Sequence, residues 1–280
     1  MTGDYPQFAK SYAHEQLVEY FLVSEADQQF IAQFRGNINR TSVTILLKSL
    51  QYLGYFPSHL SVVPADVKQF ITRQLNSPED SSQEYFWDSR TRREHFARIR
   101  QYIGFRFPTA ADKEKLDDWL RRDAALKAVT FSSLFERAIH RLGTLCIELP
   151  AESELTRIVN SALNGFFADV HHLIAQRLNE TVIANCNQLL KVADTQRLST
   201  FEWVKVPAGA AGVENLLSEI TKLQTLRKVG ITKEHLMEIP FKVQKILFQR
   251  VRNEKASEMR NHPHEIRNCR MACFVTVRTV

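Results

Sequence analysis

The sequence contains few of the residues that interrupt regular secondary structure. Among 280 residues there are nine glycines and nine prolines. This scarcity argues against an all-β protein with many turns and favours long helices joined by short loops. No stretch of about eighteen apolar residues occurs, and the first residues lack the basic start and apolar core of a secretory signal. We therefore expect a cytoplasmic protein with no membrane partner.

Cysteine and excess charge are also scarce. The four cysteines are too few and too widely spaced for a disulfide framework. Lysine and arginine number 37 against 31 aspartates and glutamates, so the formal net charge is +6. A mild basic excess favours a polyanionic partner without establishing one, because the distribution of charge decides binding more than its sum does. The ordinary apolar content of 44% rules out a disordered or fibrous chain.

Apolar residues recur at helical spacing from one end of the chain to the other. One clear case is the stripe formed by Val43, Leu46, Leu47, Leu50 and Leu53, which ends at a glycine. No competing pattern of alternating apolar and polar residues runs through the chain. The sequence therefore predicts an all-α, multi-helix fold.

Two breaks divide this helical pattern. Residues 146–150 form a short extended stretch, and residues 207–212 are small residues typical of a linker. The predicted organisation is two consecutive helical modules followed by the start of a further helical region. Its expected bounds are residues 1–145, residues 146–206 with one long helix, the linker 207–212, and residues 213–280.

Basic residues concentrate between residues 90 and 106. Six arginines lie there against one acidic residue, Glu94, which gives a local balance of +5. On a helix, Arg90, Arg93 and Arg100 would lie within about a quarter turn of one another, beside the apolar stripe. Guanidinium groups gathered on one face suit phosphate oxygens, because each offers planar, bidentate donors that stay charged. The alternative is a solvated face whose arginines pair with acids elsewhere, such as the two aspartates at positions 117 and 118.

Two further polar segments carry weaker signals. Residues 222–260 contain ten lysines or arginines and four glutamates, and an amphipathic surface helix explains them better than a binding site does. The turn at residues 35–40 places Arg35, Asn39 and Arg40 between two predicted helices. Such residues cap helix ends or approach a DNA backbone, and capping alone would account for the asparagines.

We find no pattern of residues that would form a catalytic or metal site. The segment at residues 262–265 holds two histidines and a glutamate and is followed by Cys269 and Cys273. This spacing matches no standard zinc signature, and a proline separates the histidines. The sequence also lacks a glycine-rich phosphate loop, the nucleophile motif G-x-S-x-G and the zinc motif H-E-x-x-H. We therefore expect no catalytic residue, no metal and no cofactor.

Several short motifs together resemble the N-terminal region of Tn3-family transposases. They match that family in order and spacing over about residues 15–110. The motifs are R-G-x-x-N-R at residues 35–40, Y-L-G-Y-F-P at 52–57, V-P at 63–64, Q-L at 74–75, T-R-R-E-H at 91–95, I-R at 99–100 and I-G-F-R at 103–106. A looser resemblance continues to residues 262–267, where H-P-H-E-I-R is similar to the family's H-P-x-E-I-R segment.

The resemblance implies a function for the predicted helical modules. In that family, N-terminal helical modules bind the terminal inverted repeats of the transposon, and a later RNase-H-like domain carries the acidic triad for metal-dependent strand transfer. Carried over to this chain, the resemblance implies DNA contacts for Arg35, Asn39, Arg40, Arg92, Arg93, His95 and Arg100. Arg90 joins this set because it shares the predicted arginine face.

The last residues keep an apolar pattern up to position 280. Val275 and Val277 alternate with polar neighbours as in a strand, whereas Cys273, Val277 and Val280 keep helical spacing. The resemblance favours a helix. It also implies that the chain is a transposase truncated before the catalytic domain.

These observations predict a sequence-specific DNA-binding protein that performs no chemistry and is not an enzyme. Its expected partner is double-stranded DNA carrying the terminal inverted repeats of a bacterial transposon, and a full-length transposase is a further candidate partner. Two alternatives stay open. One is a helical protein–protein adaptor that regulates a full-length transposase, and the other is a nuclease or other enzyme that uses scattered acidic residues.

Overall fold

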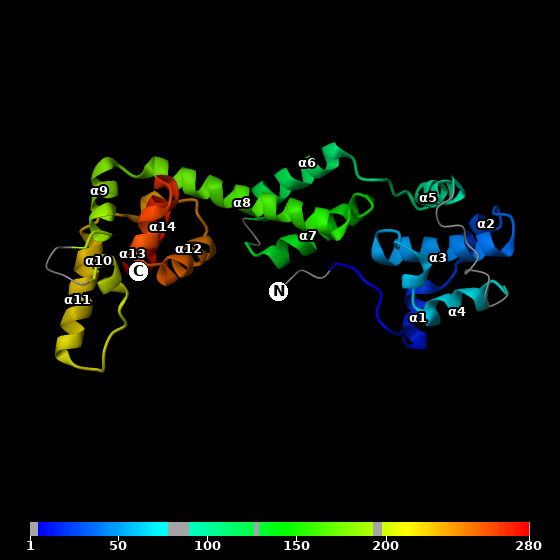
Figure 1. Ribbon diagram of the computed structural model, residues 1–280, viewed down its shortest axis with the longest axis horizontal. Helices are drawn as coiled ribbons and strands as arrows, with labels where there is room; N and C mark the ends of the chain where they lie inside the picture. The colour runs from blue at the N-terminus through cyan, green and yellow to red at the C-terminus, as the bar shows by residue number, and fades with distance from the viewer. Residues whose placement is uncertain (1–4, 78–89, 126–128, 193–197, 280) are drawn as a thin grey trace. The chain divides into compact units, whose positions relative to one another are not determined.

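The computed structural model describes residues 5–77, 90–125, 129–192 and 198–279 (Figure 1). In these ranges the regular structure is helical, and the predicted all-α fold is confirmed. The β-type pairing found in the described ranges is one isolated bridge between Arg106 and Ile147. The chain divides into two compact units, Met1–Ala162 and Leu163–Val280.

The first unit is a succession of short and medium helices. In order they are α1 (His14–Phe21), α2 (Glu25–Ile31), α3 (Asn37–Leu53), the 3-10 turn η1 (Leu60–Val62), α4 (Ala65–Gln74), α5 (Arg90–Ile103), α6 (Ala110–Trp119), the π-helical turn η2 (Leu120–Ala124), α7 (Phe131–Thr144) and the first part of α8 (Glu152–Arg177). Side-chain caps explain several of the starts. The hydroxyls of Ser24, Thr109 and Thr130 each accept a hydrogen bond from the backbone N–H three residues later.

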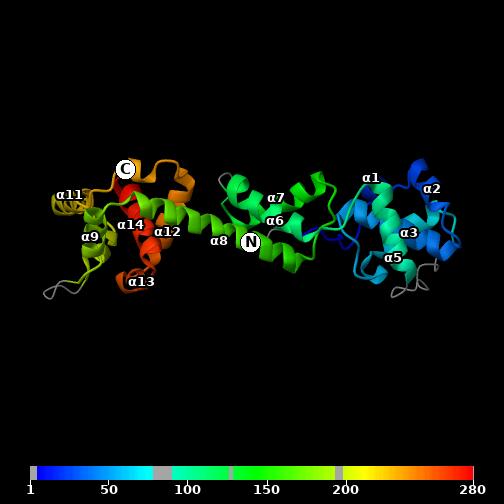
Figure 2. The ribbon, with the colours of Figure 1, turned by 90° about the horizontal axis from the view of Figure 1, so that it is seen from above.

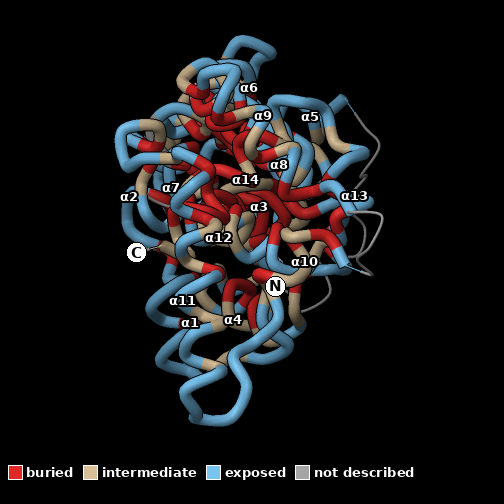
Figure 3. Tube along the Cα trace, turned by 90° about the vertical axis from the view of Figure 1, so that its left-hand side faces the viewer, coloured by how far each residue is buried: buried red, intermediate tan, exposed pale blue. Residues whose placement is uncertain are grey.

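Helix α3 is the centre of the core formed by the first five helices. Residues 41–50 of this helix, polar residues among them, are all buried. Figure 3 colours the chain by burial, with buried residues in red. Helices α1, α2, α4 and α5 pack against it, and a helix enclosed on every side buries residues all round. Two of its hydroxyl groups find partners within the helix, since Thr44 and Ser49 donate to the carbonyl oxygens of Arg40 and Ile45, whereas the buried hydroxyl of Ser42 has no partner among the described residues.

The glycine that ends α3 fills a tight position. Gly54 has a φ of 79°, and a Cβ atom there would lie 3.2 Å from Cγ of Leu149. Gly104 ends α5 with a φ of 73° but has nothing within 4 Å of its Cβ position.

We expect Gly104→Ala to lower the free energy of unfolding by about 1–2 kcal/mol through backbone strain. We expect Gly54→Ala to cost more, because the side chain of Leu149 must also move. Urea unfolding of both variants checks the order, and equal losses would argue against the contact with Leu149.

The second unit is arranged around the last helix of the chain. After the rest of α8 it contains α9 (Glu180–Leu189), α10 (Thr200–Lys205), α11 (Val213–Arg227), the 3-10 turn η3 (Lys233–Leu236), α12 (Phe241–Asn253), α13 (Ala256–Asn261) and α14 (His264–Thr279). Helices α9, α11 and α12 contact α14, and α12 lies beside it in both ribbon views (Figure 2). The ring of Phe274 packs on Phe201 and Phe248, with centroids 5.2 and 5.7 Å away. Because α14 continues to Thr279, the helix favoured for the chain's last segment is confirmed.

The two predicted breaks both lie outside helices. Residues 146–150 connect α7 to α8, and residues 207–212 connect α10 to α11. The predicted domain bounds stay predictions, and the division into two units falls inside α8. On α11 the apolar residues are divided, because Leu226 is buried while Val213, Leu216 and Leu217 are exposed.

Candidate nucleic-acid interface

Helix α5, which carries most of the predicted arginine face, is anchored through its inner side. Ile99 and His95 are buried, and two aromatic residues lock the helix onto its neighbours. The ring of Tyr102 stacks on Phe30 at 4.2 Å between centroids, and the ring of Phe96 stacks on a second phenylalanine at 3.9 Å. Stacked rings at these distances fix both position and rotation of a helix. The outer side of α5 is therefore held in a defined orientation.

The outer side of α5 presents Arg90 and Arg93 to solvent. Both residues are exposed, and neither forms an ion pair with a residue that the structure describes. Ala97 and Gln101, also exposed, continue the same side, and Glu94 is the one acidic residue of the helix. Two exposed guanidinium groups one turn apart can each approach a phosphate oxygen. Arg90 and Arg93 therefore lie on an exposed basic surface, and their contact with DNA stays a prediction.

Two further arginines of α5 lie against aromatic rings. The guanidinium of Arg98 sits 4.0 Å from the centroid of the Phe34 ring and donates to Oε1 of Gln33 at 3.0 Å. The guanidinium of Arg92 lies 5.5 Å from the centroid of Phe96. Both side chains are half-buried, so they flank the outer surface and contribute to its positive potential.

Arg100 has a different role from the one predicted for it. Its Nε donates to Oε2 of Glu148 at 2.6 Å, and both side chains are largely buried. This ion pair joins α5 to the segment between α7 and α8. The alternative of internal pairing thus holds for Arg100, with Glu148 as the partner and not the aspartates at 117 and 118. A guanidinium committed in this way has little freedom to contact DNA.

The turn at residues 35–40 mixes an exposed arginine with capping residues. Nδ2 of Asn39 donates to the carbonyl oxygen of Arg35 at 3.0 Å, and Nε of Arg40 donates to the carbonyl oxygen of Phe34 at 2.8 Å. Nη2 of Arg40 also reaches the carbonyl oxygen of Ala32 at 3.5 Å. These bonds satisfy carbonyl groups beyond the end of α2, as capping residues do. Among the described contacts, the side chains of Asn39 and Arg40 are used in these capping bonds. The side chain of Arg35 is exposed and takes part in none of them.

His95 lies on the buried side of α5. Its ring packs edge-on against Phe34 at 5.1 Å between centroids. Burial lowers the pKa of His95, so the imidazole is neutral at physiological pH. The predicted contact residues therefore separate by position: Arg35, Arg90 and Arg93 are exposed, Arg92 is at the flank, and His95 is inside.

A buried ionic network that sequence patterns did not reveal holds α2, α3 and α5 together. Oδ2 of Asp27 pairs with Nζ of Lys48 at 2.7 Å, and Oδ1 accepts the hydroxyl of Tyr102 at 3.0 Å. The same carboxylate accepts the backbone N–H of Ser24, which caps α2. Burial alone would raise the pKa of Asp27, but the hydrogen bonds from Lys48 and Ser24 lower it below its ordinary value. One carboxylate thus connects three helices, and the charges along the chain give no sign of this pairing.

The segment at residues 262–265 takes part in ion pairs. Nε2 of His262 lies 3.2 Å from a carboxylate oxygen of Glu254, and Arg270 contacts both. On α8, His172 lies 3.3 Å from a carboxylate oxygen of Glu265. Among the described residues, no group of three histidines, cysteines or acids is placed to hold a metal ion. None of the described helices combines the length and the hydropathy that crossing a membrane requires.

Comparison with known proteins identifies relatives of this chain. Residues 2–162 match a family described as a domain of unknown function, DUF4158. The transposase for transposon gamma-delta of Escherichia coli (strain K12) is 30% identical over 215 residues, which cover 73% of this chain and 21% of that protein. The transposase for transposon Tn501 of Pseudomonas aeruginosa is 24% identical over 221 residues, covering 78% and 22%. The transposase for transposon Tn1546 of Enterococcus faecium is 23% identical over 214 residues, covering 76% and 22%.

These relatives confirm one prediction and correct another. The resemblance to the N-terminal region of Tn3-family transposases is confirmed. The prediction that the chain is not an enzyme is wrong, because the relatives it matches are named as transposases, which are enzymes. The chain spans about a fifth of the length of these relatives.

Proposed function

Because this chain belongs to the DUF4158 family, and its relatives are Tn3-family transposases, we propose that it takes part in DNA transposition by binding double-stranded DNA. The proposed contact surface is the outer side of α5, with Arg90 and Arg93 on the phosphate backbone. Arg35 extends this surface, since the residue before it packs on α5. The DNA is that of the transposon's terminal inverted repeats, bound in the bacterial cytoplasm.

The observation that carries the proposal is the pair of exposed arginines on an anchored helix. Arginine offers several donors in a fixed plane and keeps its charge, which suits phosphate recognition. Residues 41–50 of helix α3 are unsuited to contact DNA because they are buried. Helix α5, in contrast, has one side fixed in the core and one side open. A full-length transposase is a further proposed partner, through the family relationship.

A second candidate function is a protein–protein adaptor. The exposed Val213, Leu216 and Leu217 of α11 favour it, because apolar side chains at helical spacing suit contact with another protein. Salt dependence separates the two functions. A protein that neutralises phosphates loses affinity for duplex DNA steeply as salt rises, whereas an adaptor shows no comparable duplex binding.

The salt slope of DNA binding tests the role of α5. Replacing Arg90 and Arg93 by alanine together is expected to lower the slope of log K against log salt by about two units, and each single change by about one. The reason is that each phosphate contact releases about one counterion. Fluorescence anisotropy with a labelled duplex at several salt concentrations measures the slope.

Two variants serve as controls for this test. Arg73→Ala removes an exposed arginine from the last turn of α4 and should leave the slope unchanged. Arg100→Ala breaks the pair with Glu148, so it should lower stability and leave the slope near that of the wild type. A double variant at Arg90 and Arg93 whose slope equals that of the wild type would rule out the proposed surface.

A further inference from the structure

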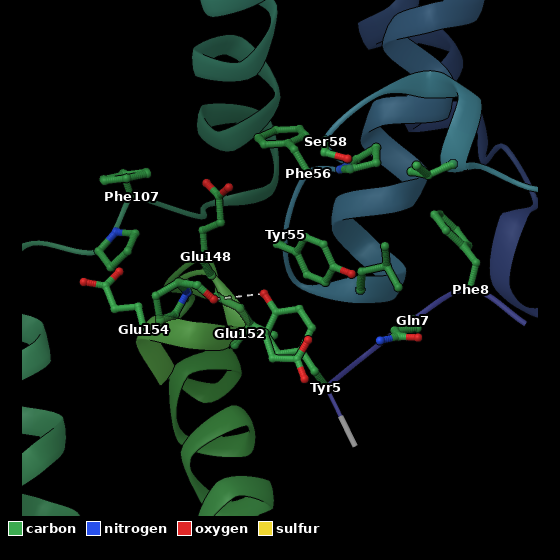
Figure 4. Close-up of a pocket in the computed structure, with 17 residues that line it drawn as sticks. Tyr5, Gln7, Phe8, Tyr55, Phe56, Ser58, Phe107, Glu148, Glu152 and Glu154 are labelled. Carbon is green, nitrogen blue, oxygen red and sulfur yellow. Dashed lines mark hydrogen bonds between the residues drawn. The ribbon is translucent and has the colours of Figure 1, made fainter. Parts of the chain in front are cut away.

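A cavity of about 740 Å³ opens in the first unit, between the N-terminal segment, the end of α3 and the start of α8 (Figure 4). Aromatic rings and carboxylates line it together, among them Tyr5, Tyr55, Phe107 and Glu152. This lining contrasts with the arginines on the outer side of α5. A polyanion such as DNA would meet negative groups here, so the cavity calls for a different ligand.

The aromatic side of the cavity is rigid. The rings of Tyr5 and Tyr55 lie 4.9 Å apart between centroids. Their hydroxyls donate to the carbonyl oxygens of Pro150 at 2.9 Å and Pro6 at 2.8 Å. With the hydroxyls satisfied, the rings offer apolar surface to a ligand. Phe107 adds a second apolar surface that is 64% exposed, which is unusual for a phenylalanine.

Three residues that line one wall of the cavity also contact a guanidinium group, that of Arg100 on α5. Arg100 places its guanidinium 5.1 Å from the centroid of Phe56 and 5.5 Å from that of Phe107, while Glu148 accepts its Nε at 2.6 Å. Rings and a carboxylate together favour a cation, because the faces of the rings and the carboxylate are all negative. The contacts of Arg100 therefore indicate that the residues of this wall suit a cationic group with an apolar stem.

A second carboxylate in the cavity has no cation opposite it among the described residues. Glu154 is paired with Lys113 at 2.6 Å, whereas Glu152 is exposed and forms no ion pair with any described residue. Glu152 lies close enough to Tyr5 and Tyr55 for its negative charge to change the pKa of their hydroxyls. Burial raises the pKa of Tyr55, and the negative charge of Glu152 raises it further. The cavity thus has a second group of aromatic rings with a carboxylate, and this carboxylate, unlike Glu148, is not paired with a cation among the described residues.

We propose that this cavity binds the cationic side chain of an arginine or lysine carried by an extended segment of a protein partner. Tyr55 and Phe107 would contact the apolar stem of that side chain, and Glu152 would face its charge. The volume exceeds what one side chain fills and lies in the range of sites for larger ligands, which leaves room for neighbouring residues of the segment. The proposal does not depend on DNA binding, because the outer residues of α5 take no part in it.

Titration with blocked tripeptides, followed by NMR, tests the proposal. The probe is N-acetyl-Ala-Arg-Ala-amide, and the control peptide carries norleucine in place of arginine, which keeps the stem and removes the charge. We expect saturable shifts at the backbone amides of Glu152 and Phe107, with a dissociation constant on the order of 1 mM. Norleucine should bind more weakly, and Glu152→Gln should weaken the arginine peptide about threefold. Phe107→Ala should weaken both peptides, because it removes a surface that contacts the stem.

Matched variants and ligands make the result decisive. Glu180→Gln removes an exposed first-turn glutamate from α9, outside the cavity, and should leave the affinity unchanged. Equal affinity for the norleucine peptide, unchanged affinity in Glu152→Gln, or no saturation far above the expected dissociation constant would each overturn the proposal. Equally tight binding of spermidine would overturn the peptide partner in favour of a free polyamine. DNA binding measured on the same variants should stay at the wild-type level, so that failure here is distinguishable from failure of the proposed function.

Discussion

Replacing Asp27 by alanine is expected to lower the free energy of unfolding by about 3–5 kcal/mol, a large share of the stability of a typical domain. The side chain of Lys48 is 6% exposed and pairs with Asp27 at 2.7 Å, so the change would leave an ammonium group buried without a counter-charge. The hydroxyl of Tyr102 and the backbone N–H of Ser24 would lose their acceptor as well. Urea unfolding monitored by circular dichroism measures the loss.

A double variant separates the cost of a stranded charge from the value of the pair. Removing both charges with Asp27→Leu and Lys48→Met should recover most of the loss, because apolar residues of similar size often replace a buried ion pair without penalty. The hydrogen bond from the backbone N–H of Ser24 to residue 27, one half of the capping box of α2, would still be missing, while the Ser24 hydroxyl would keep its place as the N-cap. Glu25→Ala, an exposed change in the same turn, should stay within about 0.5 kcal/mol of the wild type. If Asp27→Ala also stays within that limit, the network does not stabilise the fold as described.

Acid is expected to destabilise the second unit through His171. This histidine is buried, and burial together with the nearby charges of Arg270 and Arg250 lowers its pKa from 6.5 to about 4. The charged groups that face it are Arg250 on α12, Arg270 and Glu265 on α14, and His262 in the turn before α14. Of these, Glu265 alone acts in the opposite direction.

The sign of the pH effect follows from the lowered pKa. In the unfolded chain His171 takes up a proton near pH 6.5, whereas in the folded chain it does so near pH 4. Its contribution to stability is therefore complete above pH 6.5 and is lost as the pH falls toward 4. Between pH 7 and 5 the expected loss is about 2 kcal/mol, on the way to about 3 kcal/mol at full protonation.

Substitution isolates this contribution from that of other titrating groups. In His171→Leu the fall in unfolding free energy between pH 7 and 5 should be smaller than in the wild type by about 2 kcal/mol. His172→Leu is the matched control, because that neighbour is exposed and its pair with Glu265 lies at the surface. Identical pH profiles for the wild type and His171→Leu would show that the buried imidazole does not couple folding to protons.

The helical architecture was largely predictable because it depends on local spacing. The stripe from Val43 to Leu53 predicted α3, and the glycine after it predicted the end of that helix. Side-chain spacing along a helix depends on residues within a turn or two, so the sequence contains it directly. What spacing did not predict is that α3 would be enclosed on every side, because the polar residues among positions 41–50 read as a surface.

The candidate interface was predictable only as a region. The count of charges placed a basic surface on residues 90–106, and that count holds wherever the helix packs. Which arginines stay available depends on partners far away in the chain. Arg100 is paired with Glu148, 48 residues further on, and Arg40 donates to carbonyl oxygens just after α2. Arg90 and Arg93 remain exposed because Ile99, on the other side of their helix, is buried.

The sequence by itself therefore determined the helices, their approximate ends, the family relationship and the presence of a basic segment. Each of these depends on residue type and short-range spacing. Only the tertiary structure decided the pairing of Asp27 with Lys48 and Tyr102, and the meeting of Tyr5, Tyr55 and Glu152 around one cavity. A charge pair or a cavity wall forms between residues that folding brings together. Its energy depends on burial and distance, and both quantities are set by the tertiary structure.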